Sequence, residues 1–383
     1  MTKRLAWPDV AKGLSIIGVV VLHVGTFVPG ARDSLLWQAN THLDPLRMPL
    51  FFMVSGLFSS KVLNFSLGEL FRRRLWFFIV PYVVWTAVVV LLDQRNQIAD
   101  PSEAFGVQDY LVSSLKSIIT GGNWAWFLYA LVLFNLALWA TKKLPWWGTV
   151  LVALSPILFI HFKDVPIVWR SIVYLPMFII GTYMRHPIKR FAATALTPTR
   201  LMFALAGYLS SATLVKSWKS FLNAHESIAL RVPLLGDFDQ GALQLLVNQL
   251  HYLLVLPAGV VVAVALSRIP GLSRGFQFLG RNTLPIYIGH PIALKLLIAL
   301  PIAVYGLPVG VEDAGFWLST QVWIVFGLVV CAIGGVGMWL LGKIPGLRWT
   351  LYPPKLPEPA RTRIAEPSAQ SIAYSDNDQA WRA

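Results

Sequence analysis

The sequence predicts an all-α protein, a polytopic membrane helix bundle of about ten transmembrane helices with both termini in the cytoplasm. Three observations support this prediction. The chain is 56% hydrophobic and 13% charged, which is far more apolar than a soluble domain. About ten segments are long and apolar enough to cross a bilayer. Lysine and arginine gather in alternate connections between these segments.

Each predicted span has roughly the 17 to 26 residues that a helix needs to cross the hydrocarbon core. The spans cover residues 10–28, 47–63, 75–93, 124–140, 146–162, 167–184, 201–217, 244–267, 283–305 and 316–341. The first follows a short basic stretch but has no convincing small-residue cleavage site, so we expect an uncleaved span. Residues 1–345 are therefore expected to form one transmembrane domain. Residues 346–383 are rich in Pro, Ser and charge, and we expect a disordered cytoplasmic tail.

The connections between the spans differ in charge. One alternate set is basic, with Glu69 as its one acid: Lys3, Arg4, Lys61, Arg72, Arg73, Arg74, Lys142, Lys143, Arg185, Lys189, Arg190, Arg200, Arg268, Arg274, Arg281, Lys343 and Arg348. The other set, with the longer loops 29–46, 94–123 and 218–243, mixes basic residues with a larger number of acids. The positive-inside rule places the first set in the cytoplasm. This bias explains the net charge of +14 without a nucleic-acid partner, and we expect loop 218–243 to cover an extracytoplasmic mouth.

The motifs exclude several kinds of chemistry. The single cysteine, Cys331, lies in an apolar run, so it cannot form an intramolecular disulfide and we expect it to pack. No two histidines have the spacing of metal ligands, which predicts no catalytic metal. The sequence also has no Walker loop, no GxSxG elbow and no dinucleotide-binding fingerprint.

The first span, "DVAKGLSIIGVVVLHV", carries three ionisable residues on one helical stripe: Asp9, Lys12 and His23. Asp9 and Lys12 fall at the cytoplasmic boundary, and His23 lies about 16 Å further along the helix, in the outer half of the membrane. An ionisable group inside a span is by default a functional hypothesis, and a neutral imidazole is a natural general base. The alternative is that Asp9 and Lys12 pair at the interface and that His23 snorkels or bonds a carbonyl.

Three further stretches carry polar residues in or beside spans. Arg47 enters the second span, where Ser55 and Gly56 give room for close helix contact or for a cavity. At the start of the third span, Arg72, Arg73 and Arg74 combine positive charge with a helix N-terminus, which suits a phosphate group. The positive-inside rule explains the same three arginines without any ligand.

The stretch "FLGRNTLPIYIGHPIALK" places Arg281 and Asn282 at the cytoplasmic edge of the ninth span. Tyr287 and His290 follow inside the span, with Lys295 deeper still. A second histidine inside the membrane, directly before a proline, indicates the wall of a cavity. We regard Tyr287, His290 and Arg47 as candidate donors to a substrate or an oxyanion.

Taken together, "DVAKGLSIIGVVVLHV", "MPLFFMVSG", "WAWFLYALVLF", "LPMFIIGTYM" and "LGRNTLPIYIGH" resemble, in this order, the motifs of the integral-membrane acyltransferase-3 family. The resemblance covers roughly residues 5–345. It implies an acyl-CoA-dependent enzyme of the bacterial inner membrane. Such an enzyme moves an acyl group, most often acetyl from acetyl-CoA, to a hydroxyl of a glycan or glycolipid, often at the extracytoplasmic face.

The resemblance also implies roles for individual residues. His23 matches the family's essential histidine, Asp9 and Lys12 match its acidic and basic pair, and Arg72 to Arg74 match its coenzyme-binding region. Many members have two arginines separated by two residues, whereas the run here is contiguous, so the coenzyme-binding arginine is not assigned. The first two spans look most like actinobacterial members, which implies a lipid-linked trehalose, trehalose monomycolate, as the acceptor.

The functional hypothesis is therefore acetyl transfer from cytoplasmic acetyl-CoA, with His23 as general base and with Arg72 to Arg74 and Lys12 holding the coenzyme. Transfer can be direct or can pass through an acyl-histidine. The alternative from another class is an exporter of a glycan or glycolipid, which also suits ten spans with buried polar residues. A non-catalytic assembly subunit, the third reading, explains neither His23 nor His290.

Overall fold

The computed structural model describes residues 5–97, 106–225, 228–233, 236–311 and 315–357. Its helices are α1 (Trp7–Phe27), α2 (Leu35–Leu57), α3 (Leu67–Leu70), α4 (Trp76–Gln97), α5 (Val107–Thr120), α6 (Trp126–Ala140), α7 (Trp146–Leu154), α8 (Pro166–Tyr183), α9 (Arg185–Ala193), α10 (Pro198–Asn223), α11 (Gln240–Ser267), α12 (Pro270–Arg281), α13 (Thr283–Leu294), α14 (Leu300–Tyr305) and α15 (Thr320–Leu341). Two π-helical turns, η3 (Phe71–Leu75) and η6 (Lys295–Ala299), join α3 to α4 and α13 to α14.

Six helices among the described residues are long and apolar enough to cross a membrane. They cover Trp7–Phe27, Leu67–Asp93, Pro166–Tyr183, Gln240–Ser267, Thr283–Tyr305 and Thr320–Leu341. They confirm an all-α, polytopic membrane protein, and each coincides with a predicted span. The predicted span 124–140 corresponds to α6, which has 15 residues. The predicted span 146–162 corresponds to a shorter apolar helix, Trp146–Phe162. The total of about ten spans and the cytoplasmic termini remain predictions.

Local signals determine where several helices begin. Pro8 occupies the first turn of α1, where a missing N–H leaves no hydrogen bond unmade. The side-chain oxygens of Ser34 and Asp239 cap the first turns of α2 and α11. Ser66 and Glu69 form a capping box at α3, directly before the arginine run. The basic stretch is therefore held at the start of a helix by its own sequence.

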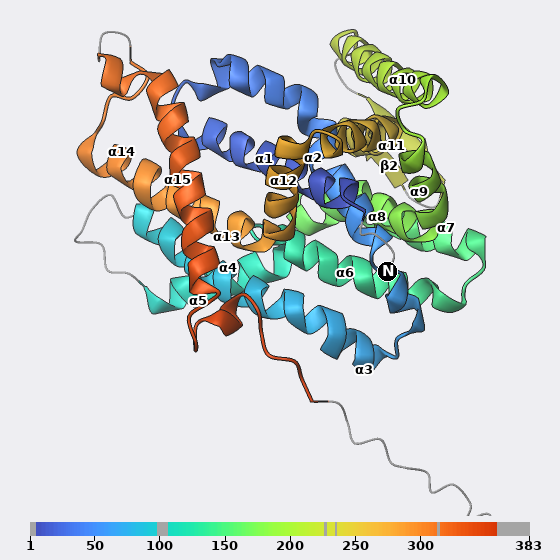
Figure 1. The fold of residues 1–383 in the computed structure, drawn as a ribbon, viewed down its shortest axis with the longest axis horizontal. Coiled ribbons are helices and arrows are strands. Elements are labelled where there is room, and N and C mark those ends of the chain that lie inside the picture. The colour runs from blue at the N-terminus through green and yellow to red at the C-terminus, as the bar shows by residue number, and fades with distance from the viewer. Residues whose placement is uncertain (1–4, 98–105, 226–227, 234–235, 312–314, 358–383) are drawn as a thin grey trace, which may run out of the picture.

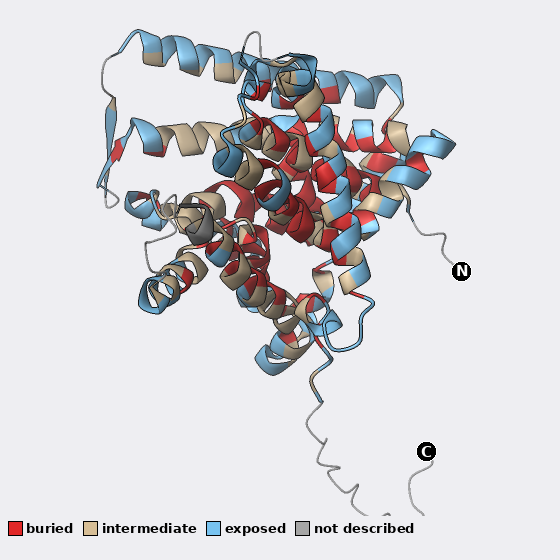
Figure 2. Cartoon of the chain, turned by 90° about the vertical axis from the view of Figure 1, so that its left-hand side faces the viewer, coloured by how far each residue is buried: buried red, intermediate tan, exposed pale blue. Residues whose placement is uncertain are grey.

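Helix α1 occupies the middle of the bundle, where it packs against α2, α11, α12 and α13 (Figure 1). α13 lies along α15, α2 along α8, and α10 along α11. The buried residues gather in the interior of the bundle, whereas the peripheral helices are mostly exposed (Figure 2). The exposed apolar side chains of these peripheral helices are the ones that a bilayer would cover.

Glycines allow the central helices to approach closely. A Cβ atom at Gly56 of α2 would collide with the carbonyl oxygen of Phe178 on α8, and one at Gly181 would collide with that of Met53. A Cβ atom at Gly280 of α12 would meet the backbone of α1 in the same way. Small residues at crossings are the usual means of helix association in membranes. Of the two predicted uses of Gly56, close contact is therefore the one observed.

The described part of the chain contains one pair of strands, β1 (Ala229–Val232) and β2 (Gly236–Asp239), within the predicted outer loop. They pair antiparallel, with Ala229 opposite Asp239. Phe238 packs with Ile160, and Lys163 donates a 2.7 Å hydrogen bond to Asp239. This bond lowers the pKa of the Asp239 carboxyl. The hairpin is thus anchored against the segment before α8 and the start of α11.

The residues after α15 contact α4. The indole N–H groups of Trp76 and Trp85 donate to the carbonyl oxygens of Pro354 and Thr350, at 3.0 and 3.2 Å. The beginning of the predicted tail therefore lies beside the helix that follows the arginine run. The rest of the predicted disordered tail, residues 358–383, lies outside the described residues.

The contact between α2 and α8 leads to a stability prediction. Gly181→Val should lower the melting temperature of the solubilised protein by several degrees, because overpacking typically costs about 1–3 kcal/mol. Gly271→Val is the matched control, since a Cβ atom at Gly271 meets nothing within 4 Å. Thermal unfolding in detergent measures both variants. Equal melting temperatures would show that the two helices can separate without loss.

Candidate functional site

Two histidines from distant parts of the chain meet inside the bundle. Nδ1 of His23 on α1 lies 2.6 Å from Nε2 of His290 on α13, across 267 residues of sequence. Their rings are nearly parallel, with centroids 4.9 Å apart and an interplanar angle of 13°. His290 is fully buried, and His23 is partly buried. Both were predicted as site residues, and the fold brings them into direct contact.

The hydrogen bonds indicate which nitrogen of each ring carries the proton. Nδ1 of His290 lies 2.7 Å from the carbonyl oxygen of Ile286, which can only accept, so this nitrogen must carry hydrogen. In a neutral ring Nε2 of His290 is then an acceptor, and Nδ1 of His23 must donate to it. The consequence is that Nε2 of His23 has a free lone pair. A carbonyl and a second imidazole thus orient His23 as a base.

Aromatic and cationic groups surround the pair. Trp124 meets the His23 ring edge to face, with centroids 4.4 Å apart, and the ring of Tyr287 lies 5.9 Å from that of His290. Lys295 Nζ lies 5.6 Å from the centre of the Trp124 ring and forms an ion pair with Asp93 of α4. Lys295 begins the π-helical turn η6, and such turns are frequent at functional sites.

Arg47 of α2 lies beside α1. It is 7% exposed, its stem packs where Gly18 has no side chain, and Gly18 is about 7 Å along the helix from His23. Its guanidinium pairs with Asp44 and donates to the carbonyl oxygen of Asn40 at 3.2 Å. The side-chain oxygen of Asn40 is buried with no partner among the described residues. Arg47 is therefore near the pair but is already engaged on its own helix.

The other end of α1 carries a separate ionic contact. Arg281 Nε donates to Asp9 at 3.0 Å, and Asp9 is only 7% exposed. Lys12 lies over two aromatic rings of α2 and its C-terminal end, 5.8 Å from Phe51 and 5.7 Å from Phe58. This contact between α1 and α12 supplies Asp9 with a cationic partner from a distant part of the sequence.

The predicted coenzyme arginines lie on the π-helical turn η3, and one of them shares a neighbour with Lys12. Arg74 donates to the carbonyl oxygen of Phe58 at 2.7 Å, and Phe58 is also the residue beneath Lys12. Arg73 lies 3.7 Å from the Glu69 carboxylate. The fold therefore unites two sets of cations that the sequence places in different spans.

Between the levels of Lys12 and His23, side chains fill most of the space beside α1. A cavity of about 10 Å³ lies between α1, α2, α6 and α13. Its lining residues are Ser15, Ile16, Val19, Met48, Phe51, Phe127, Thr283 and Tyr287. It has room for about one water molecule. Phe127 and Tyr287 fill the space, with ring centres 3.8 Å apart.

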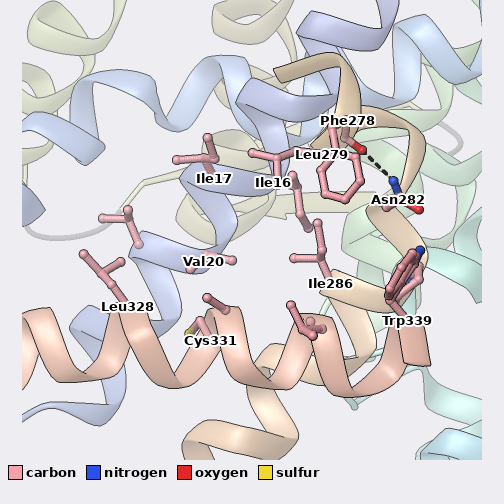
Figure 3. Close-up of a pocket in the computed structure, with 15 residues that line it drawn as sticks. Ile16, Ile17, Val20, Phe278, Leu279, Asn282, Ile286, Leu328, Cys331 and Trp339 are labelled. Carbon is pink, nitrogen blue, oxygen red and sulfur yellow. Dashed lines mark hydrogen bonds between the residues drawn. The ribbon is translucent and has the colours of Figure 1, made fainter. Parts of the chain in front are cut away.

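A larger apolar groove of about 360 Å³ opens between α1, α12, α13 and α15 (Figure 3). Its residues include Val20, Cys331 and Trp339, and Asn282, the polar side chain of the lining, donates to the carbonyl oxygen of Phe278 at 2.8 Å. Ile286, whose carbonyl oxygen accepts the hydrogen bond from His290, also lines this groove.

Among the described residues, no three His, Cys, Asp or Glu side chains form a group that could hold a metal ion.

Sequence reasoning missed Trp124 and Arg170. Arg170 of α8 lies between two indoles, with ring centres 4.4 Å away at Trp126 and 5.0 Å away at Trp169. It donates to the carbonyl oxygen of Gly121 at 2.5 Å, and its Nε is buried with no partner in the described part of the chain. One arginine inside the apolar run "VPIVWRSIVYLPMFII" was the available signal.

Residues 5–343 match the model of the acyltransferase-3 family, described as an acyltransferase domain. The "Inner membrane protein YcfT" of Escherichia coli (strain K12) is 26% identical over 276 residues, which cover 60% of this chain and 74% of YcfT. No solved structure matches the chain.

The ion pair between Lys295 and Asp93 leads to a prediction. Asp93→Asn should lower the melting temperature more than Lys295→Met, because it leaves a buried ammonium, 4% exposed, without its carboxylate. The expected loss is about 1–3 kcal/mol, below that of a fully buried pair, since Asp93 is 46% exposed. Thermal unfolding of both single variants and the double variant measures the coupling. Additive effects would contradict a direct interaction.

Proposed function

The chain belongs to the acyltransferase-3 family of membrane acyltransferases, and from this premise we propose that it transfers an acetyl group from cytoplasmic acetyl-CoA to a hydroxyl of a glycan or glycolipid. The family match covers residues 5–343, which includes every helix described above. The contact between His23 and His290 carries the proposal, because it leaves a base with a free lone pair within the bundle. The acyl donor, the acetyl group and the acceptor are parts of this proposal.

We also propose a location in the bacterial inner membrane, with about ten spans and both termini in the cytoplasm. The E. coli relative is named an inner membrane protein. The basic residues of alternate connections support the orientation. Under this arrangement Asp9, Lys12 and Arg74 face the cytoplasm, whereas His23 lies about 16 Å from Lys12 toward the outer face.

The proposed reaction begins at Nε2 of His23. This nitrogen takes the proton of the acceptor hydroxyl while the oxygen attacks the thioester carbonyl carbon. The new C–O bond forms, the C–S bond breaks, and the imidazolium returns its proton to the departing sulfur. The products are the acetyl ester and free coenzyme A. His290 keeps Nδ1 of His23 engaged through the whole cycle, so that Nε2 remains the nitrogen that faces the acceptor.

The neighbouring residues have supporting roles in this proposal. Tyr287, beside His290, and Arg47, beside α1, remain the candidate donors to the oxyanion. Lys12 and Arg74 meet at Phe58 and would face the negative nucleotide of the donor. Because the rings of Phe127 and Tyr287 meet beside the small cavity between Lys12 and His23, a bound donor arm would have to displace them.

For the acceptor we propose a lipid-linked trehalose, trehalose monomycolate. The support is the resemblance of the first two spans to actinobacterial members of the family. Mass spectrometry of lipids from cells with and without the gene tests this assignment. A mass increase of one acetyl group on the trehalose lipid is the expected result. Acetylation of a different glycan would retain the enzyme and replace the acceptor.

His23→Ala should abolish acetyl transfer, because a positioned general base contributes roughly 10²–10⁴-fold to the rate. The measurement is the transfer of radiolabelled acetyl from acetyl-CoA to membrane lipids. His42→Ala is the matched control, since His42 is an exposed histidine in the N-terminal half of α2. Both variants should reach wild-type levels in the membrane. Full activity of His23→Ala would remove His23 from the mechanism.

The role of His290 can be separated from that of His23. His290→Gln keeps an oxygen that can accept from Nδ1 of His23, whereas His290→Leu removes every acceptor. We therefore expect kcat to fall about tenfold or more in the leucine variant and less in the glutamine variant. The KM for acetyl-CoA should change little in both, because His290 does not reach the donor. Equal loss in the two variants would indicate packing alone.

A further inference from the structure

A polar cavity opens at the predicted cytoplasmic end of the bundle, and none of its lining residues belongs to the arginine run. It has a volume of about 390 Å³ and lies between the turn η2 (Ser60–Asn64) and the end of α8. Its lining residues are Ser60, Lys61, Leu63, Asn64, Thr182, Tyr183 and Arg185. Two are cationic, four are neutral and polar, and none is acidic. We call this cavity the Lys61/Arg185 pocket.

The walls of the Lys61/Arg185 pocket are held by hydrogen bonds. Arg185 donates from Nη1 to Ser60 Oγ at 2.7 Å, which fixes its guanidinium at the wall. Thr182 donates to the carbonyl oxygen of Gly56 at 2.8 Å, and Tyr183 and Thr141 share a 2.8 Å bond between their hydroxyls. The positive-inside rule explains why an arginine lies on this side of the membrane. It does not explain why the side chain is fixed toward a cavity.

More cations border the same segment. Arg74 donates to the carbonyl oxygen of Phe58 at 2.7 Å, and Lys142 donates to that of Phe65 at 3.3 Å. The turn that forms one wall of the pocket is thus bracketed by two further positive charges. Glu69, the acid nearest in sequence, is paired with Arg73 at 3.7 Å.

We propose that the Lys61/Arg185 pocket binds phosphate groups of the nucleotide end of acyl-CoA. This inference rests on the proposed function and names the residues that hold its donor. Arginine and lysine are the usual phosphate ligands, and the volume is within the roughly 300–1,000 Å³ of small-molecule sites. The turn that lines the pocket follows Phe58 by two residues, and Lys12 lies over the Phe58 ring. From Lys12, His23 lies about 16 Å further along α1, which is the distance that the flexible arm of the donor would cover.

The assignment separates the arginines by role. Arg74 and Arg185 border the segment that would hold the nucleotide, whereas Arg73 is paired with Glu69. The contiguous arginine run therefore does not need to match the spaced arrangement of other family members. The phosphate of an anionic lipid headgroup has the same chemistry at this depth, so the experiment must distinguish the two sources.

The test uses the purified full-length protein in phosphatidylcholine nanodiscs. Calorimetry measures the affinity for coenzyme A and for adenosine 3′,5′-bisphosphate, which lacks the arm. Lys61→Ala and Arg185→Gln should each weaken both ligands by about tenfold or more. Lys189→Ala and Arg190→Gln, on the exposed surface of α9, make the same charge changes outside the pocket and should leave both affinities unchanged. Gel filtration confirms that each variant is folded.

Three outcomes would overturn the inference. If the wild type binds coenzyme A and the pocket variants bind it equally well, the nucleotide lies elsewhere and the proposed function survives. If the variants keep coenzyme A affinity but lose retention of phosphatidylglycerol in mixed nanodiscs, the pocket serves a lipid headgroup. If the wild type binds neither coenzyme A nor the bisphosphate, both the inference and the proposed function fail.

Discussion

Every charged side chain that enters the interior of this bundle needs a partner, because neither the protein core nor lipid can solvate it. Asp9 of α1 takes Arg281 of α12, and Lys295 takes Asp93 of α4. Arg170 packs against two indole rings and donates a hydrogen bond to a backbone carbonyl oxygen, where Asp9 and Lys295 have charged partners. Most of these contacts join different helices, so they contribute to the choice of neighbouring spans. The hydrogen bonds of His23 and His290 follow from the same need, because polar rings inside the bundle also require partners.

Close packing between helix backbones also holds the central helices together. The glycines at 56, 181 and 280 let α2, α8, α12 and α1 approach until backbone meets backbone. Helix α1 is thereby held on several sides, and His23 is carried on a rigid element and not on a loop. Catalytic geometry is easier to maintain on such an element, because neighbouring side chains fix the rotamer of the reacting group.

The two ends of α1 have different chemistry. Toward the predicted outer face, a carbonyl and two imidazoles form a chain that ends in a lone pair on His23. Toward the predicted cytoplasmic face, Lys12, Arg74 and the Lys61/Arg185 pocket create a positive surface. The bulky rings of Phe127 and Tyr287 separate them. Under the proposed function, the arm of a bound donor would have to move these rings aside to reach His23.

The amino-acid sequence was sufficient to predict the fold class and six spans that the structure also has. It also placed His23, Arg47, Tyr287 and His290 inside helices. Hydropathy and charge suffice for this, because each span must satisfy its backbone internally and be apolar along its own length. The tertiary structure decided that His23 meets His290, that Asp9 meets Arg281, and that Arg185 faces Ser60. Periodicity shows which face of a helix is polar, but it does not show which distant helix covers that face. That choice depends on packing between segments hundreds of residues apart, which no local pattern records.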